Sequence, residues 1–182
     1  AAGDGGRGAA VDISAPKLAI TSGDPSGIDP TATRIDVATL NGLSAESLLL
    51  GATRSTSGDT TTLSVGADTV TLANDAKHAL TGPEIMLAAR NTLTLKSGSK
   101  IDAQGNSGAV GNYETAGNGA FGRAASSSAT FARTGSPDRG QGTLIGEPAV
   151  KDADGNIVTA AATITAADSI ALDATKENAF KG

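Results

Sequence analysis

Short pairs of alternating apolar residues recur along this chain at a nearly constant spacing, and this repeat constrains the fold more than any other feature. One pair occurs three times, separated by 22 and then 23 residues: Leu48-x-Leu50, Val70-x-Leu72 and Leu93-x-Leu95. A second pair occurs twice, 22 residues apart: Leu63-x-Val65 and Ile85-x-Leu87. Similar pairs lie near both ends of the sequence, in VDISAPKLAIT and in residues 162–175. Each repeat unit therefore predicts two short strands.

A strand with alternating side chains buries only one face, and a short strand pair is not stable alone. Stacking each unit on a copy of itself covers both the apolar face and the backbone edge, which produces a β-solenoid with ladders of like residues. We expect an all-β fold in which residues 1–182 form a single segment of such a stack. One inner wall would contain Leu48, Leu50, Val70, Leu72, Leu93 and Leu95, and another Leu63, Val65, Ile85 and Leu87.

Competing architectures account for the repeat less well. An immunoglobulin-like sandwich also has short strands with frequent turns, but it does not predict a pair that returns after 22 or 23 residues. A helical repeat requires a period of 3.6 residues, and the abundant Thr, Ser and Gly are poor helix formers. Residues 38–50 can carry a helical turn, because Ser44 to Ser47 (SAES) resembles a capping box. Asn41-Gly42 argues against a long helix there.

The composition excludes several classes of function. The net charge is -5 and no basic patch is visible, which argues against nucleic acid or an anionic membrane as a partner. No apolar run approaches the roughly 20 residues that cross a bilayer. Aromatic residues make up 2% of the 182 residues, and cysteine is absent. The chain begins AAGDGGRG, without an initiator Met or a signal peptide, so we expect it to be a piece of a longer protein.

The regular pattern fails in three segments. Residues 22–37 are rich in turn-forming Gly and Pro, and residues 151–158 (KDADGNIV) predict a hairpin that turns at Asp154-Gly155-Asn156. Residues 106–140 form a Gly/Ser-rich insertion. Insertions in a solenoid leave at the corners of the stack, so we expect these segments to project from it.

The insertion at residues 106–140 contains the candidate binding residues. They are three aromatic and two basic side chains among Gly and Ser: Tyr113, Phe121, Arg123, Phe131 and Arg133. Rigid amphipathic side chains in an adaptable polar background are typical of a binding surface. The other interpretation is that the aromatic rings fold back and cover the end or the side of the stack.

Several phrases resemble one known group of proteins. The run ESLLLGATRSTSGDTTTLSVGADTVTLANDAKHALTGPEIMLAARNTLTLKSGSKIDAQG (residues 46–105), the phrase DISAPKLAIT and the segment GNYETAGNGAFGRAASSS resemble the filamentous haemagglutinin-like large exoproteins of Gram-negative bacteria. The resemblance covers most of the chain. It implies a right-handed parallel β-helix, export by two-partner secretion, and a role at the cell surface or in the medium in adhesion, aggregation or biofilm formation. It implies no catalytic residues.

Other motifs suggest chemistry only weakly. His78 follows Asp75, but no nucleophile motif accompanies them, and we interpret His78 as a corner residue. Glycoside hydrolysis needs two carboxylates about 5–10 Å apart, and the candidate pairs are Asp68 with Glu84 and Asp102 with Glu114. Residues 152–156 (DADGN) depart from the EF-hand pattern, which leaves a weak surface cation at Asp152, Asp154 and Asn156 as the alternative to a simple turn. We predict no catalytic residue, metal or cofactor.

The sequence thus predicts a non-catalytic segment of a secreted or surface-exposed filamentous adhesin. Its partners would be neighbouring β-helix segments or copies of itself end to end, and a receptor or glycan on a host or bacterial surface. Two alternatives stay open: a purely structural filament subunit, and a β-helix enzyme that processes polysaccharides. Because both ends of a stack expose strand edges, we expect end-to-end association or assembly into fibres.

Overall fold

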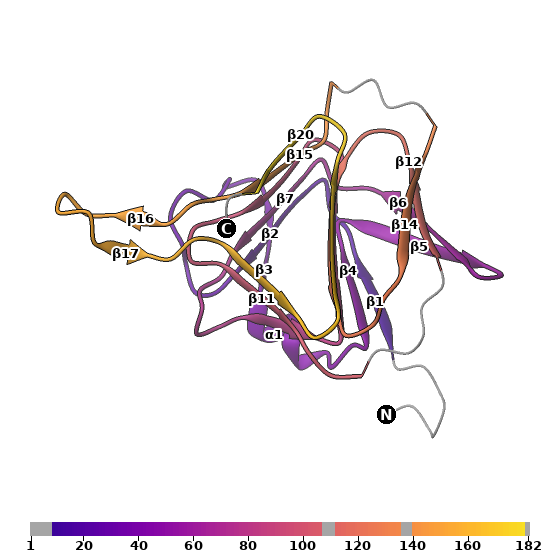
Figure 1. Ribbon diagram of the computed structural model, residues 1–182, viewed down its shortest axis with the longest axis horizontal. Coiled ribbons are helices and arrows are strands. Elements are labelled where there is room, and N and C mark those ends of the chain that lie inside the picture. The colour runs from indigo at the N-terminus through magenta and orange to yellow at the C-terminus, as the bar shows by residue number, and fades with distance from the viewer. Residues whose placement is uncertain (1–8, 107–111, 136–139, 181–182) are drawn as a thin grey trace.

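The computed structural model describes residues 9–106, 112–135 and 140–180, and it shows an all-β protein with several parallel sheets. Within these residues the chain forms 20 strands and one helix. Three sheets make the sides of a triangle in Figure 1, a fourth sheet lies outside one of those sides, and a hairpin projects from the opposite corner. The prediction of an all-β fold is confirmed.

The six-stranded sheet is parallel throughout. Its spatial order is β20 (Glu177–Phe180), β15 (Thr143–Gly146), β10 (Thr92–Leu95), β7 (Thr69–Ala73), β2 (Lys17–Thr21) and β3 (Thr33–Asp36). Val70 lies opposite Leu93 and Leu72 opposite Leu95, and all four are buried. The predicted ladder between these two pairs is therefore confirmed.

The other two sides of the triangle are a five-stranded and a three-stranded sheet. The five-stranded sheet comprises β1 (Ala10–Ile13), β4 (Ser47–Leu50), β9 (Glu84–Ala89), β13 (Ala120–Ala125) and β19 (Ser169–Ala174). The three-stranded sheet comprises β18 (Thr163–Ala166), β11 (Lys100–Ala103) and β8 (Leu80–Gly82). The inward side chains of all three sheets meet in one apolar core, which contains Leu18, Leu48, Leu72, Leu87, Leu93 and Leu144.

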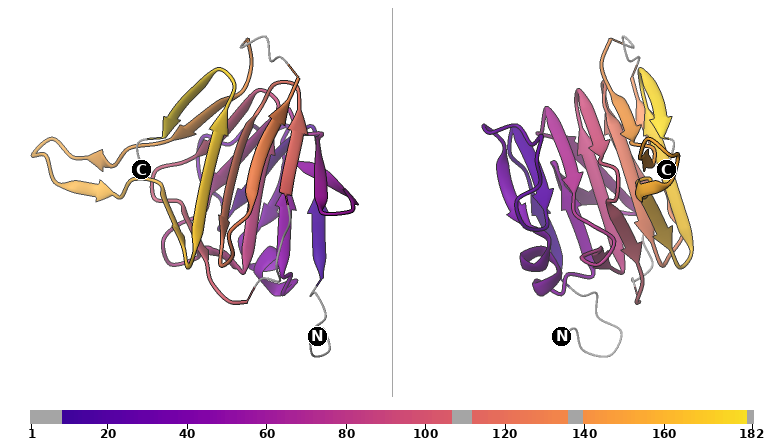
Figure 2. Two further views of the ribbon diagram at one scale, coloured as in Figure 1. Left: turned by 45° about the vertical axis from the view of Figure 1, so that its right-hand side comes forward. Right: turned by 90° about the vertical axis from the view of Figure 1, so that its left-hand side faces the viewer.

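Strands from successive parts of the chain lie side by side from one end of the stack to the other, as Figure 2 shows. The chain visits the five-, six- and three-stranded sheets in that order through β4, β7 and β8, and again through β9, β10 and β11. Val70 is followed by its partner Leu93 after 23 residues, which is the spacing that the repeat predicts.

The predicted register is wrong for the other pairs. Leu48 and Leu50 pair with Ile85 and Leu87 in the five-stranded sheet, not with Val70 and Leu72 in the six-stranded one. The separation between these partners is 37 residues, because a hairpin is inserted between β4 and β7. Leu63 lies on that hairpin, outside the main core, so it does not share a wall with Ile85.

The inserted hairpin belongs to a four-stranded sheet that covers the outer face of the five-stranded sheet. It comprises β14 (Thr130–Thr134), β12 (Asn112–Ala116), β6 (Thr60–Val65) and β5 (Ala52–Ser57). Gly51 sits where the chain passes from one sheet to the other, with a φ of +93°, and a Cβ there would lie 2.0 Å from the carbonyl oxygen of Ala88. Only glycine fits this crossing.

Residues 112–134 do not project as an insertion. They supply β12 and β14 to the four-stranded sheet and β13 to the five-stranded sheet. Strand β13 runs antiparallel to both of its neighbours, β9 and β19, so the parallel pairing of the expected β-helix is wrong here. Its inward residues are small, which leaves room for Leu93 and Leu172 beside Gly122. Residues 107–111 and 136–139 of the predicted insertion lie outside the described residues.

The segment that does project is the hairpin of β16 (Val150–Lys151) and β17 (Ile157–Thr159), as predicted from residues 151–158 (Figure 2). Its base is held by Glu147, whose carboxylate accepts hydrogen bonds from Lys96 Nζ at 2.8 Å and from the Ser97 amide at 3.0 Å. Val150, Ile157 and Val158 are 47%, 63% and 61% exposed, which is unusual for apolar residues of this size.

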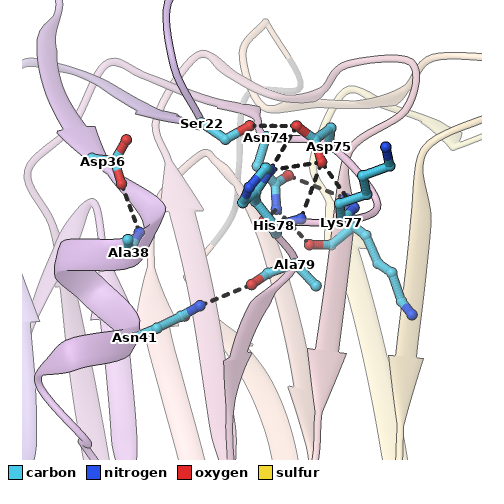
Figure 3. Close-up of polar contacts among 10 residues, drawn as sticks. Ser22, Asp36, Ala38, Asn41, Asn74, Asp75, Lys77, His78 and Ala79 are labelled. Atoms are coloured by element: carbon cyan, nitrogen blue, oxygen red, sulfur yellow. Dashed lines mark hydrogen bonds and ion pairs between the residues drawn. The ribbon is translucent and has the colours of Figure 1, made fainter.

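One helix, α1 (Val37–Gly42), lies at the N-terminal end of the stack next to β8. Asp36 caps it by accepting a hydrogen bond from the Ala38 amide, so the helix starts earlier than predicted and Ser44 is not its cap. The Asn41 side chain donates to the Ala79 carbonyl oxygen at 2.9 Å (Figure 3). Its oxygen accepts from the Thr81 amide at 3.0 Å. It thereby substitutes for the backbone of a neighbouring strand along this edge of β8.

Candidate functional site

The structure brings all five predicted binding residues together, between the five-stranded and the four-stranded sheets. Tyr113 on β12 and Phe131 on β14 are cross-strand partners. Phe121 on β13 stacks on Phe131, with ring centroids 4.2 Å apart and planes 5° from parallel. We call this region the side core. Its other buried members are Leu49, Ala52, Leu63, Met86 and Ala88.

The two arginines lie against the aromatic rings. The guanidinium carbon of Arg123 is 5.7 Å from the centroid of Tyr113, and that of Arg133 is 5.9 Å from the centroid of Phe131. Both distances fall within the range of cation–π contacts. Each arginine also forms an ion pair, Arg123 with Glu84 and Arg133 with Asp173. The charges of the predicted site are therefore already partnered within the molecule.

Burial decides what this cluster can do. Tyr113, Phe121 and Arg123 are each 2% exposed, whereas Phe131 and Arg133 are half-buried. A receptor cannot contact the first three without separating the two sheets. The aromatic rings therefore fold back and cover the side of the stack, as in the alternative interpretation of the insertion at residues 106–140.

Glu84 is the centre of a buried polar network that was not predicted from the sequence. Its Oε1 accepts from Arg123 Nε at 2.7 Å, and its Oε2 accepts from the Tyr113 hydroxyl at 2.9 Å. The Ser47 hydroxyl also donates to Oε2, at 2.5 Å. Both carboxylate oxygens are occupied, and the side chain is 1% exposed. The sign of this network in the sequence is the single acidic residue in the otherwise apolar strand EIMLAA.

The network extends from Glu84 through Ser47 to Arg54 on β5 and Asp12 on β1. Arg54 donates to the Ser47 hydroxyl at 2.7 Å and forms an ion pair with Asp12 at 2.6 Å. Burial raises the pKa of the Tyr113 hydroxyl far above its usual value, and the nearby Glu84 charge raises it further. Tyr113 therefore stays protonated and donates to Glu84. The arrangement joins two sheets and leaves no open position for a substrate at Glu84.

Asp75 and His78 lie together at a corner, next to Ser22, but not in the order of a catalytic triad (Figure 3). His78 Nδ1 is 2.9 Å from an oxygen of Asp75, and Ser22 donates to Asp75 at 3.1 Å. In a triad the imidazole contacts the serine, whereas here the carboxylate lies between the two. The hydrogen bond from His78, with further ones from backbone amides and Ser22, lowers the pKa of Asp75 to about 2.

The candidate carboxylate pairs are each held by separate partners. Asp68 pairs with Arg90 at 2.8 Å, while Glu84 is buried against Arg123. Asp102 accepts from Thr165 on β18, and Glu114 accepts from Thr62 on β6. Asp68 lies outside the strands and Glu84 is buried, whereas Asp102 lies on the three-stranded sheet and Glu114 on the four-stranded sheet.

The hairpin tip contains the predicted cation candidates. Asp152 accepts hydrogen bonds from the backbone amides of Asp154 and Asn156, at 3.0 and 2.9 Å, and these bonds help to lower its pKa. Its oxygens are thus engaged in a turn. Across residues 9–106, 112–135 and 140–180, no three His, Cys, Asp or Glu side chains gather as metal ligands would.

A groove with a volume of about 640 Å³ lies beside α1. Leu40, Leu43, Leu48 and Pro83 supply its apolar wall. Of the described residues that line it, only Glu46 has an ionisable side chain, so the groove lacks a pair of groups for acid–base chemistry. Among the described residues, no helix has the length and hydropathy that a bilayer crossing requires.

These features define an all-β protein with several parallel sheets, in which the predicted binding residues form a side core between two of the sheets. No family model matches the chain, and neither does any curated protein or solved structure.

Proposed function

We propose that this chain is a segment of a right-handed parallel β-helix. Support comes from the order in which the chain revisits its sheets, since β4, β7 and β8 are followed in the same order by β9, β10 and β11. Parallel strands joined by crossover connections are right-handed in nearly all proteins, which supports the hand. The 23-residue separation of Val70 and Leu93 then corresponds to one turn of the β-helix.

On this fold we propose a non-catalytic function, in an exported filamentous adhesin of a Gram-negative bacterium that acts at the cell surface or in the medium. The shaft is stiff because parallel ladders satisfy the backbone of each layer through its neighbours. Its resemblance to filamentous haemagglutinin-like exoproteins supports export and adhesion. The partner is a receptor or glycan on a host or bacterial surface.

The observation that carries this proposal is the β16–β17 hairpin. It stands out from the corner between the six-stranded and three-stranded sheets (Figure 1), and it exposes Ile157 and Val158. A two-stranded hairpin has little stability of its own, so one that exposes large apolar residues is better explained by contact with a partner than by folding. The side core is less suited to this role because Tyr113 and Phe121 are buried and Phe131 is half-buried.

The test compares two surface variants in binding to intact bacterial and animal cells and to immobilised glycans. Ile157→Ser/Val158→Ser should reduce binding by at least tenfold and leave the thermal midpoint unchanged. Leu43→Ser, which alters another exposed apolar residue (44% exposed) far along the chain, should bind as the wild type does. Unchanged binding by the hairpin variant, or no binding by the wild type, would instead support a purely structural filament subunit.

Deleting residues 106–140 would not identify the binding surface, because the deletion removes β12, β13 and β14 together with Tyr113 and Arg123. The deletion is expected to unfold the protein whatever its partner.

A further inference from the structure

The outer face of the six-stranded sheet carries threonine at matching positions of three neighbouring strands, β7, β10 and β15. The residue in the middle of each pair is buried in the apolar core, so the two residues that flank it point outward. We call this set the threonine face. Its members are Thr69 and Thr71 on β7, Thr92 and Thr94 on β10, and Thr143 and Ile145 on β15.

The register aligns these side chains in two straight rows. The first residue of each pair lies opposite the first residue on the next strand, and the second lies opposite the second, with no bulge between β7, β10 and β15. Neighbouring strands are about 4.7–4.9 Å apart, and residues two positions apart along a strand are separated by about 6.6 Å. The threonine face is therefore a regular grid in two dimensions.

The hydroxyl groups of this grid have no partner inside the protein. Within the described residues, none of the five threonine hydroxyls on the face donates or accepts a hydrogen bond. Hydroxyls of the four-stranded sheet differ, since Thr62 donates to Glu114 and Thr115 to the Leu63 carbonyl oxygen, both at 3.0 Å. All six side chains of the threonine face are partly exposed. Their hydrogen-bonding capacity is therefore open to a partner outside the molecule.

The chemistry of the face restricts what that partner is. It has no charged group, and the nearest charges in its first row are Lys17 on β2 and Glu177 on β20. Its six members include no aromatic or arginine side chain, the types on which contacts with protein partners mostly depend. What the grid offers is hydroxyl groups, each a donor and an acceptor, alternating with methyl groups at a fixed spacing.

We propose that the threonine face adsorbs to ice. The oxygen atoms on the prism faces of hexagonal ice repeat at similar distances in two directions, so the hydroxyls can occupy positions of the lattice while the methyl groups order the water between them. A charged side chain would retain its own hydration shell and disturb this layer. The β16–β17 hairpin is not part of the face, so this inference succeeds or fails independently of the proposed adhesin function.

The first measurement is thermal hysteresis, the gap between the melting and freezing points of a small ice crystal in a solution of the protein. The wild type should produce a gap and should be incorporated into a slowly growing ice hemisphere. Thr94→Lys, in the middle of one row, should abolish both effects. Thr53→Lys is the matched control, because it places the same charge on an exposed threonine of the four-stranded sheet, and it should behave as the wild type does. Circular dichroism should be the same for all three proteins.

A second variant separates the shape of the face from its charge. Thr71→Tyr adds a neutral ring that lifts the lattice off its neighbours, and it should also abolish the gap. A parallel arm measures sedimentation of the wild type with crystalline cellulose, a solid that also presents ordered hydroxyls, and no binding is expected. The proposal is overturned by a wild type without hysteresis, by hysteresis retained in either face variant or lost in Thr53→Lys, or by binding to cellulose in place of ice.

Discussion

Glu84 links the four-stranded sheet to the five-stranded sheet through a buried polar network. It lies on β9, in the five-stranded sheet, and it receives the Tyr113 hydroxyl from β12 and the Arg123 guanidinium from β13. Buried charges of this kind are tolerated only when paired and hydrogen-bonded, and here both carboxylate oxygens are satisfied. Removing the charge of Glu84 leaves Arg123 as an uncompensated buried cation.

We therefore predict that Glu84→Gln destabilises the protein by about 3–5 kcal/mol, the usual cost of breaking a buried ion pair by removing one partner. Urea unfolding followed by circular dichroism measures this directly. Asp24→Asn is the matched control, because Asp24 pairs with Arg34 at 2.5 Å but has an 89% exposed side chain. That change should cost less than about 1 kcal/mol, as exposed pairs do. Equal effects of the two variants would contradict a structural role for Glu84.

The lowered pKa of Asp75 predicts that the stability of the protein depends on pH. The hydrogen bond from His78 lowers its folded pKa from 3.8 to about 2, so the folded state favours the charged carboxylate. The stability that Asp75 contributes is therefore complete above its unfolded pKa of 3.8 and is lost as the pH falls towards 2. The thermal midpoints of the wild type and Asp75→Asn should differ at pH 5 and converge near pH 2. A constant difference across this range would show that the charge of Asp75 is not involved.

At the scale of the element, α1 covers the exposed edge of β8 through the side chain of Asn41. Asn41→Ala removes the hydrogen bonds to Ala79 and to Thr81 of β8 without lowering helix propensity, and should cost about 1–2 kcal/mol. Amide hydrogen exchange of Thr81 should become at least tenfold faster, since its acceptor is lost. Gln104→Ala, which removes a single contact to Asp102 on an exposed surface, should leave Thr81 unchanged. Protection of Thr81 in the Asn41 variant would mean that another group covers this edge.

Strands with a clear alternation of apolar residues, such as those that contain Val70 and Leu93, could be predicted from the sequence. The projecting hairpin could be predicted from its Asp-Gly-Asn turn. Strand β13 could not be recognised. Its sequence AFGRAA has small inward residues, and its outward Arg123 looks like a surface charge until Glu84 is placed beside it. Burial of both faces removes the alternation on which strand prediction relies.

At the scale of the whole molecule, the register depends on what is inserted between repeats. Leu48 has the same local pattern as Val70, but its partner is Ile85, because the β5–β6 hairpin lengthens that turn of the chain. The structure brings the five candidate residues together, but whether they face solvent or the stack depends on how the four-stranded sheet packs against the five-stranded one. That docking is a long-range event, in which β12 pairs with β6 more than fifty residues earlier.

The reversed direction of β13 has a consequence for how the protein forms. Winding in one direction from the N-terminus can form β9, β10 and β11, but β13, the next strand of the five-stranded sheet, runs opposite to β9. Strand β19 then has no template until that return pass is complete. We therefore expect β19 to fold late, because it pairs with β13 about fifty residues earlier in the chain and such non-local contacts slow folding.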